Sequence, residues 1–227
     1  MIAHRGVSGL ERENTCPAFV AAGVKSYYGV ETDVRMTKDG KFIICHDGDL
    51  MRVGGLNVSI GESTFLELRK LRLKDTDDVT AREDLCLPSL QEYVAICRKY
   101  DKQSILELKA EFPEHKIVQM VELIKSMGWL DRTTFISFYG ENLVLLKKAF
   151  PQADAQFLAM KCGEEELAFM EKHALDADLF HRAITKELVE TLHAKGLKVN
   201  CWTVDDLETA ARMRDCGVDF ITSNILE

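Results

Sequence analysis

The sequence predicts a closed (β/α)8 barrel, the TIM barrel, formed by a single domain over residues 1–227. Short apolar runs alternate with amphipathic stretches almost from end to end, and the runs are rich in Val, Ile, Phe and Leu, as buried parallel strands are. Repeated strand–helix units imply right-handed crossovers and therefore a parallel sheet. About eight such units in this length fit a closed barrel better than an open, doubly wound sheet.

The expected strands are the short apolar runs between turn and helix signals. They cover residues 1–4, 29–34, 42–45, 104–108, 134–138, 155–160, 197–202 and 218–222, with a weaker run at 177–180. The run at 42–45 is ambiguous, because Asp39-Gly40 before it is a hairpin signal. It either pairs antiparallel with 29–34 or forms a strand of the barrel, and the sequence leaves both open.

The helices between these strands carry recognisable start and stop signals. Ser89 and Glu92 have the spacing of a capping box at the start of one helix. Thr185 is a predicted N-cap, and Gly196 follows that helix as a stop. Pro17 occupies the first turn of the first helix, where its missing N–H costs nothing.

The interval from 47 to about 87 departs from the strand–helix alternation. It is largely polar, contains several glycines and includes an acidic run at 75–78. We expect an excursion over one end of the barrel, with a helix near 63–71. Because barrel enzymes vary specificity through such loops, we expect this segment to determine substrate choice rather than catalysis.

Composition and charge narrow the possible functions. The chain has 29 Lys and Arg against 37 Asp and Glu, a net charge of −8 that disfavours a nucleic-acid-binding protein. No apolar run is long enough to span a bilayer, and residues 1–6 do not resemble a signal peptide. The cysteines are odd in number and include no CxxC pair, which favours a reducing compartment. We therefore expect a cytoplasmic protein without a membrane-spanning segment; the oligomeric state stays open.

Two pairs of charged residues lie on strands that we expect to be buried. Both pairs are near the carboxyl ends of these strands, where barrel enzymes have their active sites. Glu31 and Asp33 are two residues apart, as are Glu107 and Lys109, so each pair points to one face of its strand. A charged residue in an apolar strand usually marks a solvated edge. Burying three carboxylates together, however, is prohibitively costly unless a cation compensates. We predict a divalent cation bound by Glu31, Asp33 and Glu107, and the all-oxygen ligands favour Mg²⁺ or Ca²⁺.

Other polar and aromatic groups also fall at strand ends. His4 and His46 would each be structural by default, but their position beside a predicted cation site makes them acid–base candidates. Arg5 and Lys109 are either salt-bridge partners of the carboxylates or ligands of a phosphate group. Trp202 is either a core aromatic or packs against the apolar part of a substrate.

The succession of these motifs resembles the glycerophosphodiester phosphodiesterase family. The motifs are His4-Arg5-Gly6, Glu13-Asn14-Thr15, Glu31-Thr32-Asp33-Val34, His46-Asp47, Leu106-Glu107-Leu108-Lys109 and Trp202-Thr203-Val204. Together they span nearly the whole chain. The resemblance implies a metal-dependent TIM barrel with a small insertion after the His-Asp motif. It also implies hydrolysis of small glycerophosphodiesters to glycerol 3-phosphate and an alcohol.

The same resemblance implies a role for each motif residue. It makes His4 and His46 the acid–base pair and the three carboxylates the metal ligands. It places Arg5 and Lys109 on the phosphate, and it has Asn14 order the first loop or contact the site. The resemblance also makes the 2-hydroxyl of glycerol a candidate attacking group, which the sequence itself does not show.

Two positions depart from the family's pattern. Arg12 stands where Pro is common, and the last strand ends Ser223-Asn224 where an Asp-Pro type ending is usual. Both lie outside the acid–base and metal set, so we expect consequences for loop shape and rim contacts alone.

Two other functions compete with this interpretation. A related barrel phospholipase acting on a lipid phosphodiester would favour a continuous apolar surface in the 47–87 segment, whose apolar residues are interrupted by Gly and polar residues. A non-catalytic barrel that binds a metal or a phosphodiester is disfavoured because every motif residue that the chemistry needs is present.

Overall fold

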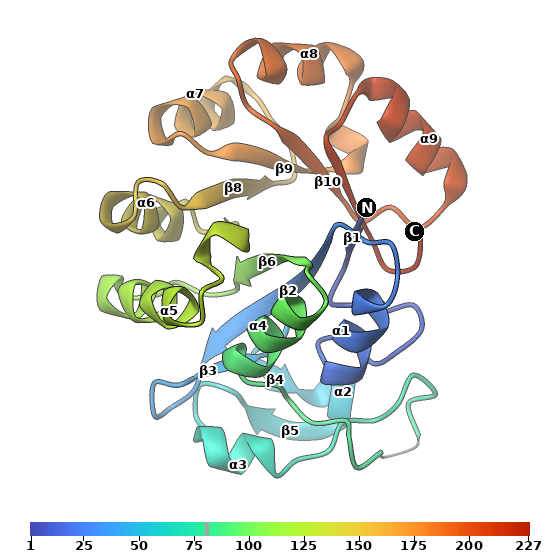
Figure 1. Ribbon diagram of the computed structural model, residues 1–227, viewed down its shortest axis with the longest axis vertical. Helices are drawn as coiled ribbons and strands as arrows, with labels where there is room; N and C mark the ends of the chain where they lie inside the picture. The colour runs from blue at the N-terminus through green and yellow to red at the C-terminus, as the bar shows by residue number, and fades with distance from the viewer. Residues whose placement is uncertain (80–81) are drawn as a thin grey trace.

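The barrel predicted from the sequence is present in the computed structural model, which describes residues 1–79 and 82–227 (Figure 1). Within these residues, eight parallel strands close on themselves because β1 pairs with both β2 and β11. In barrel order they are β1 (Ile2–Ala3), β2 (Gly29–Met36), β6 (Gln103–Leu108), β7 (Thr133–Ser137), β8 (Asp154–Ala159), β9 (Asp176–Phe180), β10 (Val199–Trp202) and β11 (Phe220–Ser223). The weak run at 177–180 is therefore a full member of the barrel.

The ambiguous run at 42–45 forms β3 (Phe42–Ile44), which lies outside the barrel. It pairs antiparallel with the end of β2, with Val34 opposite Ile44 and Met36 opposite Phe42. The turn between them contains Gly40 at a φ of 69°, a left-handed conformation that glycine adopts without strain. The Asp-Gly signal thus marks a hairpin, and the chain reaches the next barrel strand only at β6.

Helices cover the outside of the barrel, as Figure 1 shows for α5 to α9. Their bounds are α1 (Cys16–Gly23), α4 (Leu90–Lys99), α5 (Glu114–Ser126), α6 (Gly140–Ala149), α7 (Glu164–His173), α8 (Lys186–Ala194) and α9 (Leu207–Cys216), with 3-10 turns η1 (Leu130–Arg132) and η2 (His181–Ala183). The capping box of Ser89 and Glu92 starts α4, and Thr185 caps α8. No helix in the described part of the chain is long and apolar enough to cross a membrane.

The segment after β3 is a compact insertion with a core of its own. It contains β4 (Asp49–Leu50), α2 (Met51–Gly54), β5 (Leu56–Ser59) and α3 (Phe65–Arg69), so it has two short helices where we expected one. Its buried apolar side chains, with two from the β3 region, are Ile43, Cys45, Leu50, Val53, Ile60, Leu68, Leu73, Leu85 and Leu87. Residues that alternate with Gly and polar groups along the chain are thus collected into one cluster.

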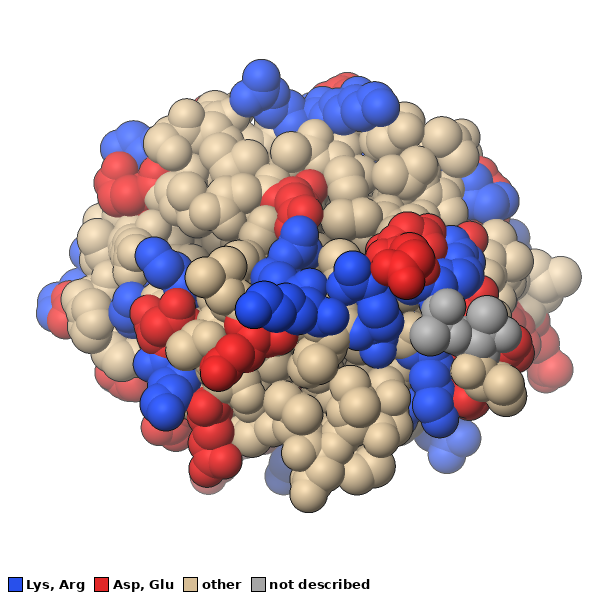
Figure 2. All heavy atoms as spheres, turned by 90° about the horizontal axis from the view of Figure 1, so that it is seen from below, with Lys and Arg blue, Asp and Glu red and all other residues tan. Residues whose placement is uncertain are grey.

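The insertion lies at the lower edge of Figure 1. Figure 2 shows the molecule from below, so the face that contains the insertion points toward the viewer. Acidic and basic side chains lie next to one another on that face, without an extended field of one sign. Several charged residues of the insertion are paired within it or with the barrel. Arg82, for example, contacts Glu11, Asp75 and Asp84.

The interior of the barrel contains a thin apolar layer. Ile2, Ile105, Ile136 and Leu158 form it, and Trp202 and Phe220 pack against it. The larger core lies between the strands and the helices, because alternate strand residues point outward: Ala177 and Leu179 of β9 belong to that outer core. The inner layer separates the two ends of the barrel, and the polar groups predicted to be functional lie at the carboxyl end of the strands.

Candidate active site

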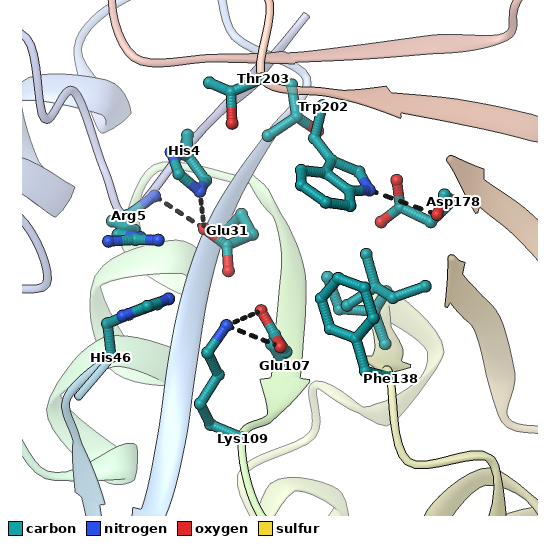
Figure 3. Close-up of a pocket in the computed structure, with 13 residues that line it drawn as sticks. His4, Arg5, Glu31, His46, Glu107, Lys109, Phe138, Asp178, Trp202 and Thr203 are labelled. Carbon is teal, nitrogen blue, oxygen red and sulfur yellow. Dashed lines mark hydrogen bonds and ion pairs between the residues drawn. The ribbon is translucent and has the colours of Figure 1, made fainter. Parts of the chain in front are cut away.

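One cavity at the carboxyl end of the barrel collects most of the predicted site residues (Figure 3). Its volume is about 210 Å³. It is lined by His4, Arg5, Glu31, His46, Glu107, Lys109, Trp202 and Thr203, together with Ile136, Phe138, Leu158, Asp178 and Thr222. The two remaining predicted residues, Asn14 and Asp33, lie next to this lining and hydrogen-bond each other. In Figure 3 the histidines lie on one side of Glu31 and Glu107, and the aromatic rings lie on the other.

Glu31, Asp33 and Glu107 form a buried cluster of carboxylates. One ligand atom from each lies within 4.8 Å of the others. The register of the barrel explains this, because Asp33 of β2 is directly opposite Glu107 of β6 and Glu31 points to the same face of β2. Burial and then repulsion from Asp33 raise the pKa of Glu107 to about 8. Burial, Asp33 and Glu107 raise the pKa of Glu31 well above its usual range.

These carboxylates have the donor chemistry that a divalent cation requires. Three oxygen ligands, mutual repulsion and a buried Asp33 oxygen that lacks a hydrogen-bond partner among the described residues all fit a hard cation such as Mg²⁺ or Ca²⁺. Such an ion would relieve the repulsion that raises the pKa values of the two glutamates.

Asp33 stays ionised, in contrast to its neighbours. Burial alone would raise its pKa, but Arg5 and Lys109 outweigh burial and hold it well below the usual range. The Nε atom of Arg5 and the Nζ atom of Lys109 each lie 3.5 Å from an oxygen of Asp33. Asn14 donates to Asp33 Oδ2 at 2.7 Å, and Thr32 donates to Asn14 Oδ1, which fixes the orientation of the amide. Asn14 thus connects the first loop to the carboxylate cluster.

The loop after β1 has an unusual backbone that directs Arg5. Arg5 itself has a φ of 53°, and its N–H donates to Glu31 Oε2 at 2.8 Å. At the next residue, Gly6, a Cβ would lie 2.6 Å from the carbonyl carbon of Ala18, so no larger residue fits. The guanidinium group of Arg5 also pairs with Glu13 at 2.8 Å. The close approach of Ala18 therefore requires glycine at the position after Arg5.

His4 is held by a residue from the opposite end of the chain. Its Nδ1 lies 2.7 Å from Oδ1 of Asn224, and its Nε2 lies 3.9 Å from Glu31. Ser8 donates to the same amide oxygen, while the amide nitrogen of Asn224 donates to Asp205. Asn224 therefore presents an acceptor, so the imidazole carries its proton on Nδ1 and turns Nε2 toward the carboxylates. Burial and then Arg5 lower the pKa of His4 to about 4.

His46 has a carboxylate partner instead. Its Nδ1 lies 2.7 Å from Oδ1 of Asp47, and Arg52 donates to the other oxygen of Asp47 at 2.7 Å. Burial lowers the pKa of His46, although the charge of Asp33 opposes that effect. Both histidines are thus oriented through Nδ1, one by an amide and the other by a carboxylate.

Arg52, which we had not singled out from the sequence, links the insertion to both halves of the site. In α2 it donates to Asp47 and to both carboxylate oxygens of Glu13. Because Glu13 also binds Arg5, ion pairs run from Arg5 through Glu13 and Arg52 to Asp47, which hydrogen-bonds His46. The insertion therefore contacts the carboxylate partners of two predicted site residues, Glu13 of Arg5 and Asp47 of His46.

The two departures from the family's pattern have different consequences. Arg12 donates to the carbonyls of Lys74 and Asp75 and pairs with Asp78, so it fastens the first loop to the insertion. That agrees with an effect on loop shape. Asn224, in contrast, contacts His4 directly, so our expectation of rim contacts alone is wrong for the end of the last strand. The error arises because β1 and β11 are neighbours in the closed barrel.

An aromatic wall faces the carboxylates across the cavity. The rings of Phe138 and Trp202 meet edge to face with centroids 5.5 Å apart. Trp202 Nε1 donates to the carbonyl of Asp178 at 3.3 Å, and Nζ of Lys109 lies 5.8 Å from the centroid of the Phe138 ring. Trp202 is therefore a pocket residue that also touches the inner apolar layer. Phe138 and Asp178 carry no sequence motif that we recognised.

Fold and site together define a TIM-barrel enzyme whose pocket combines two histidines, two cationic side chains and a carboxylate cluster, the groups used in phosphoryl chemistry. Comparison with known proteins narrows this class. The family model described as "Glycerophosphoryl diester phosphodiesterase family" matches residues 4–226. The chain belongs to this family of phosphoric diester hydrolases.

Individual relatives agree with this assignment. A glycerophosphodiester phosphodiesterase of Caldanaerobacter subterraneus is 30% identical, covering 99% of this chain and 93% of the relative. One of Bacillus altitudinis is 28% identical, covering 97% and 92%. Among solved structures, an Oleispira antarctica phosphodiesterase in complex with the product sn-glycerol-3-phosphate has a TM-score of 0.89 at 26% identity, covering 98% and 92%. The glycerophosphodiester phosphodiesterase of Thermotoga maritima has a TM-score of 0.80 at 27% identity, covering 98% of this chain and 93% of that one.

Proposed function

We propose that this protein hydrolyses small glycerophosphodiesters to glycerol 3-phosphate and an alcohol, with His4 and His46 as the acid–base pair. One observation supports the proposal best: both histidines line the cavity beside the carboxylate cluster that could hold a metal ion. The product named for the Oleispira antarctica structure, sn-glycerol-3-phosphate, is the product that we propose here.

Glu31, Asp33 and Glu107 are the residues that would hold a divalent cation. When bound, the cation supplies positive charge that stabilises the phosphoryl oxygens as negative charge grows on them. Arg5 and Lys109 add two fixed cationic groups in the same cavity, where a substrate phosphate would meet them.

The proton transfers fall to the two imidazoles. In each ring Nδ1 is engaged by Asn224 or Asp47, so Nε2 is the atom available for exchange with the substrate. One histidine removes a proton from the attacking group, and the other protonates the leaving alkoxide, which departs as the alcohol. Attack by water gives glycerol 3-phosphate directly, whereas attack by the glycerol 2-hydroxyl gives a cyclic phosphate that a water molecule then opens to glycerol 3-phosphate. The cavity is small compared with the roughly 300–1,000 Å³ of drug-sized pockets, which suits a compact, polar substrate.

A turnover assay tests this function. Glycerophospho-choline, -ethanolamine, -glycerol and -inositol would be offered with Mg²⁺ or Ca²⁺, with a chelator, and to the variants His4→Ala and His46→Ala. We expect release of glycerol 3-phosphate that needs the cation and falls roughly a hundredfold or more in either variant. Unchanged activity after exhaustive chelation, or in both variants, would contradict the proposal.

A p-nitrophenyl diester separates the roles of the two histidines, because its leaving group needs no protonation. The variant that lacks the general acid should recover much of its rate on this substrate, and the variant that lacks the base should not. Equal recovery in both variants would argue against a division into acid and base.

A further inference from the structure

Asp178 is a buried carboxylic acid in the cavity that the proposed mechanism does not use. It lies on β9, and its side chain is 2% exposed. It points to the barrel interior because the residues on either side of it, Ala177 and Leu179, belong to the outer core. Its Oδ1 has no hydrogen-bond partner among the described residues. In Figure 3 it lies across the cavity from Arg5 and His46, next to Trp202.

Asp178 lies at the floor of the cavity. It is directly opposite Leu158 of β8, which belongs to the inner apolar layer, and opposite Asn200 of β10. Trp202 and Ile136 line the same cavity, and Trp202 Nε1 donates to the backbone carbonyl of Asp178. A buried carboxyl oxygen without a hydrogen-bond partner costs stability, so a polar ligand group is the expected partner of Oδ1.

The chemistry of the acid indicates which polar group that is. Burial and then Glu107 raise the pKa of Asp178 well above its usual range, and a hydrogen bond from Asn200 offsets this only in part. A neutral carboxylic acid both donates and accepts hydrogen bonds. A hydroxyl group does the same and matches it, whereas an ammonium group donates alone and would require the ionised form.

We propose that Asp178 is a specificity residue that binds the free terminal hydroxyl group of the glycerol moiety at the floor of the cavity. The inference rests on the proposed function. It restricts the substrate class to diesters whose terminal glycerol hydroxyl is unsubstituted, because an acyl or alkyl group there would meet a closed floor and leave Asp178 unpaired.

The test compares three substrates. Glycerophosphocholine has the hydroxyl group; its deoxy analogue, built on propane-1,2-diol, lacks it but keeps the secondary hydroxyl; its terminal methyl ether cannot donate. We expect the wild-type protein to prefer glycerophosphocholine over either analogue by roughly tenfold to a hundredfold in kcat/KM, the size of one hydrogen bond to an ionisable group.

Substitution of Asp178 should remove this preference. In Asp178→Leu the kcat/KM ratio between glycerophosphocholine and the deoxy analogue should approach one, chiefly because turnover of glycerophosphocholine falls. Asp178→Asn, which keeps the shape and some hydrogen-bonding capacity, should give an intermediate ratio and remains informative if the Leu variant does not fold. The matched control is Asp176→Asn, two residues earlier on β9 and in the lining of a separate pocket at the other end of the barrel. It should keep the wild-type ratio.

The outcomes separate this proposal from the function on which it rests. If the wild-type protein turns over none of the glycerophosphodiesters with either cation, the proposed function fails. If it turns over glycerophosphocholine and the deoxy analogue equally well, or if the Asp178 variants keep the wild-type preference, the role of Asp178 is refuted while the function stands. A loss confined to cationic head groups, with glycerophosphoglycerol unaffected, would assign Asp178 to an ammonium group and also overturn the proposal.

Discussion

Oδ1 of Asn224 accepts a hydrogen bond from Nδ1 of His4 over 2.7 Å, although 220 residues separate the two in sequence. The contact fixes the tautomer of the imidazole, and Asp205 in turn holds the amide nitrogen of Asn224. Through this contact the end of the last barrel strand determines which nitrogen of His4 faces the carboxylates.

Replacing Asn224 should therefore disturb the orientation and the pKa of His4 while the imidazole itself stays in place. Asn224→Ala should lower kcat by about tenfold or more, but by less than His4→Ala. Asn224→Asp adds a carboxylate beside the imidazole, so the limb of the kcat/KM pH profile that belongs to His4 should move to higher pH. Ser8→Ala removes the other hydrogen bond to the same amide oxygen and is the control. A profile that is unchanged in Asn224→Asp would refute this coupling.

Cation binding and pH should be linked through Glu107. Its folded-state pKa of about 8 lies above the usual 4.5, so its contribution to stability is complete below about pH 4.5 and is lost as the pH rises through about 8. A divalent cation replaces the proton. The cation should therefore raise the thermal midpoint more at about pH 9 than at about pH 6.

The variant Glu107→Gln is compared with the wild-type protein. Its amide has the shape of the protonated acid but cannot lose a proton. Thermal midpoints of this variant are measured with chelator and with cation. The rise that the cation causes should be much smaller than in the wild-type protein at both pH values. Glu111→Gln, on the exposed loop after β6, should behave as wild type. A cation effect of wild-type size in Glu107→Gln would remove this residue from the ligand set.

Arg52 should matter for turnover although it lies in the insertion. Arg52→Ala breaks the contacts to Glu13 and Asp47 and should lower kcat/KM by about tenfold to a hundredfold, the usual effect of losing a partner that orients a site residue. Arg72→Ala removes an exposed ion pair of the same insertion, with Glu83, and should change kcat/KM little. If Arg52→Ala changed kcat/KM as little as Arg72→Ala, the ion pairs of Arg52 would be unimportant for turnover.

The insertion should contribute to stability through its own core. Leu68 of α3 is fully buried, so Leu68→Ala should lower the free energy of unfolding by about 2–5 kcal/mol. Leu66 lies on the same helix and is 70% exposed, so Leu66→Ala should change it by no more than about 0.5 kcal/mol. Denaturant unfolding of both variants measures the difference. A loss below about 1 kcal/mol for Leu68→Ala would mean that the cluster is loosely packed.

The features that the sequence predicted well depend on local patterns. The spacing of Glu31 and Asp33 determines their common face wherever β2 lies, and the barrel hypothesis then places Glu107 on the same end. Caps such as Ser89 depend on residues three positions apart. Most of the predicted site residues line one cavity, and Asn14 and Asp33 lie beside it.

The features that sequence reasoning missed depend on tertiary arrangement. Asn224 meets His4 only because the barrel closes between its first and last strands. Arg52 reaches Glu13 because the insertion folds back on the first loop. Asp178 looks like an ordinary polar residue in a short strand until the residues beside it are seen to pack outward. None of these contacts leaves a periodic signal in the chain.

The closure of the barrel also fixes the order in which the pocket is assembled during synthesis. β1 is made before the other barrel strands, but one of its two neighbours is β11, the last barrel strand to be made. Until β11 emerges, the nascent chain has an open seam next to β1, and His4 lacks the amide that orients it. The pocket is thus completed only after β11 and Asn224 have been made, and a chain that stops in α9 lacks the amide that orients His4.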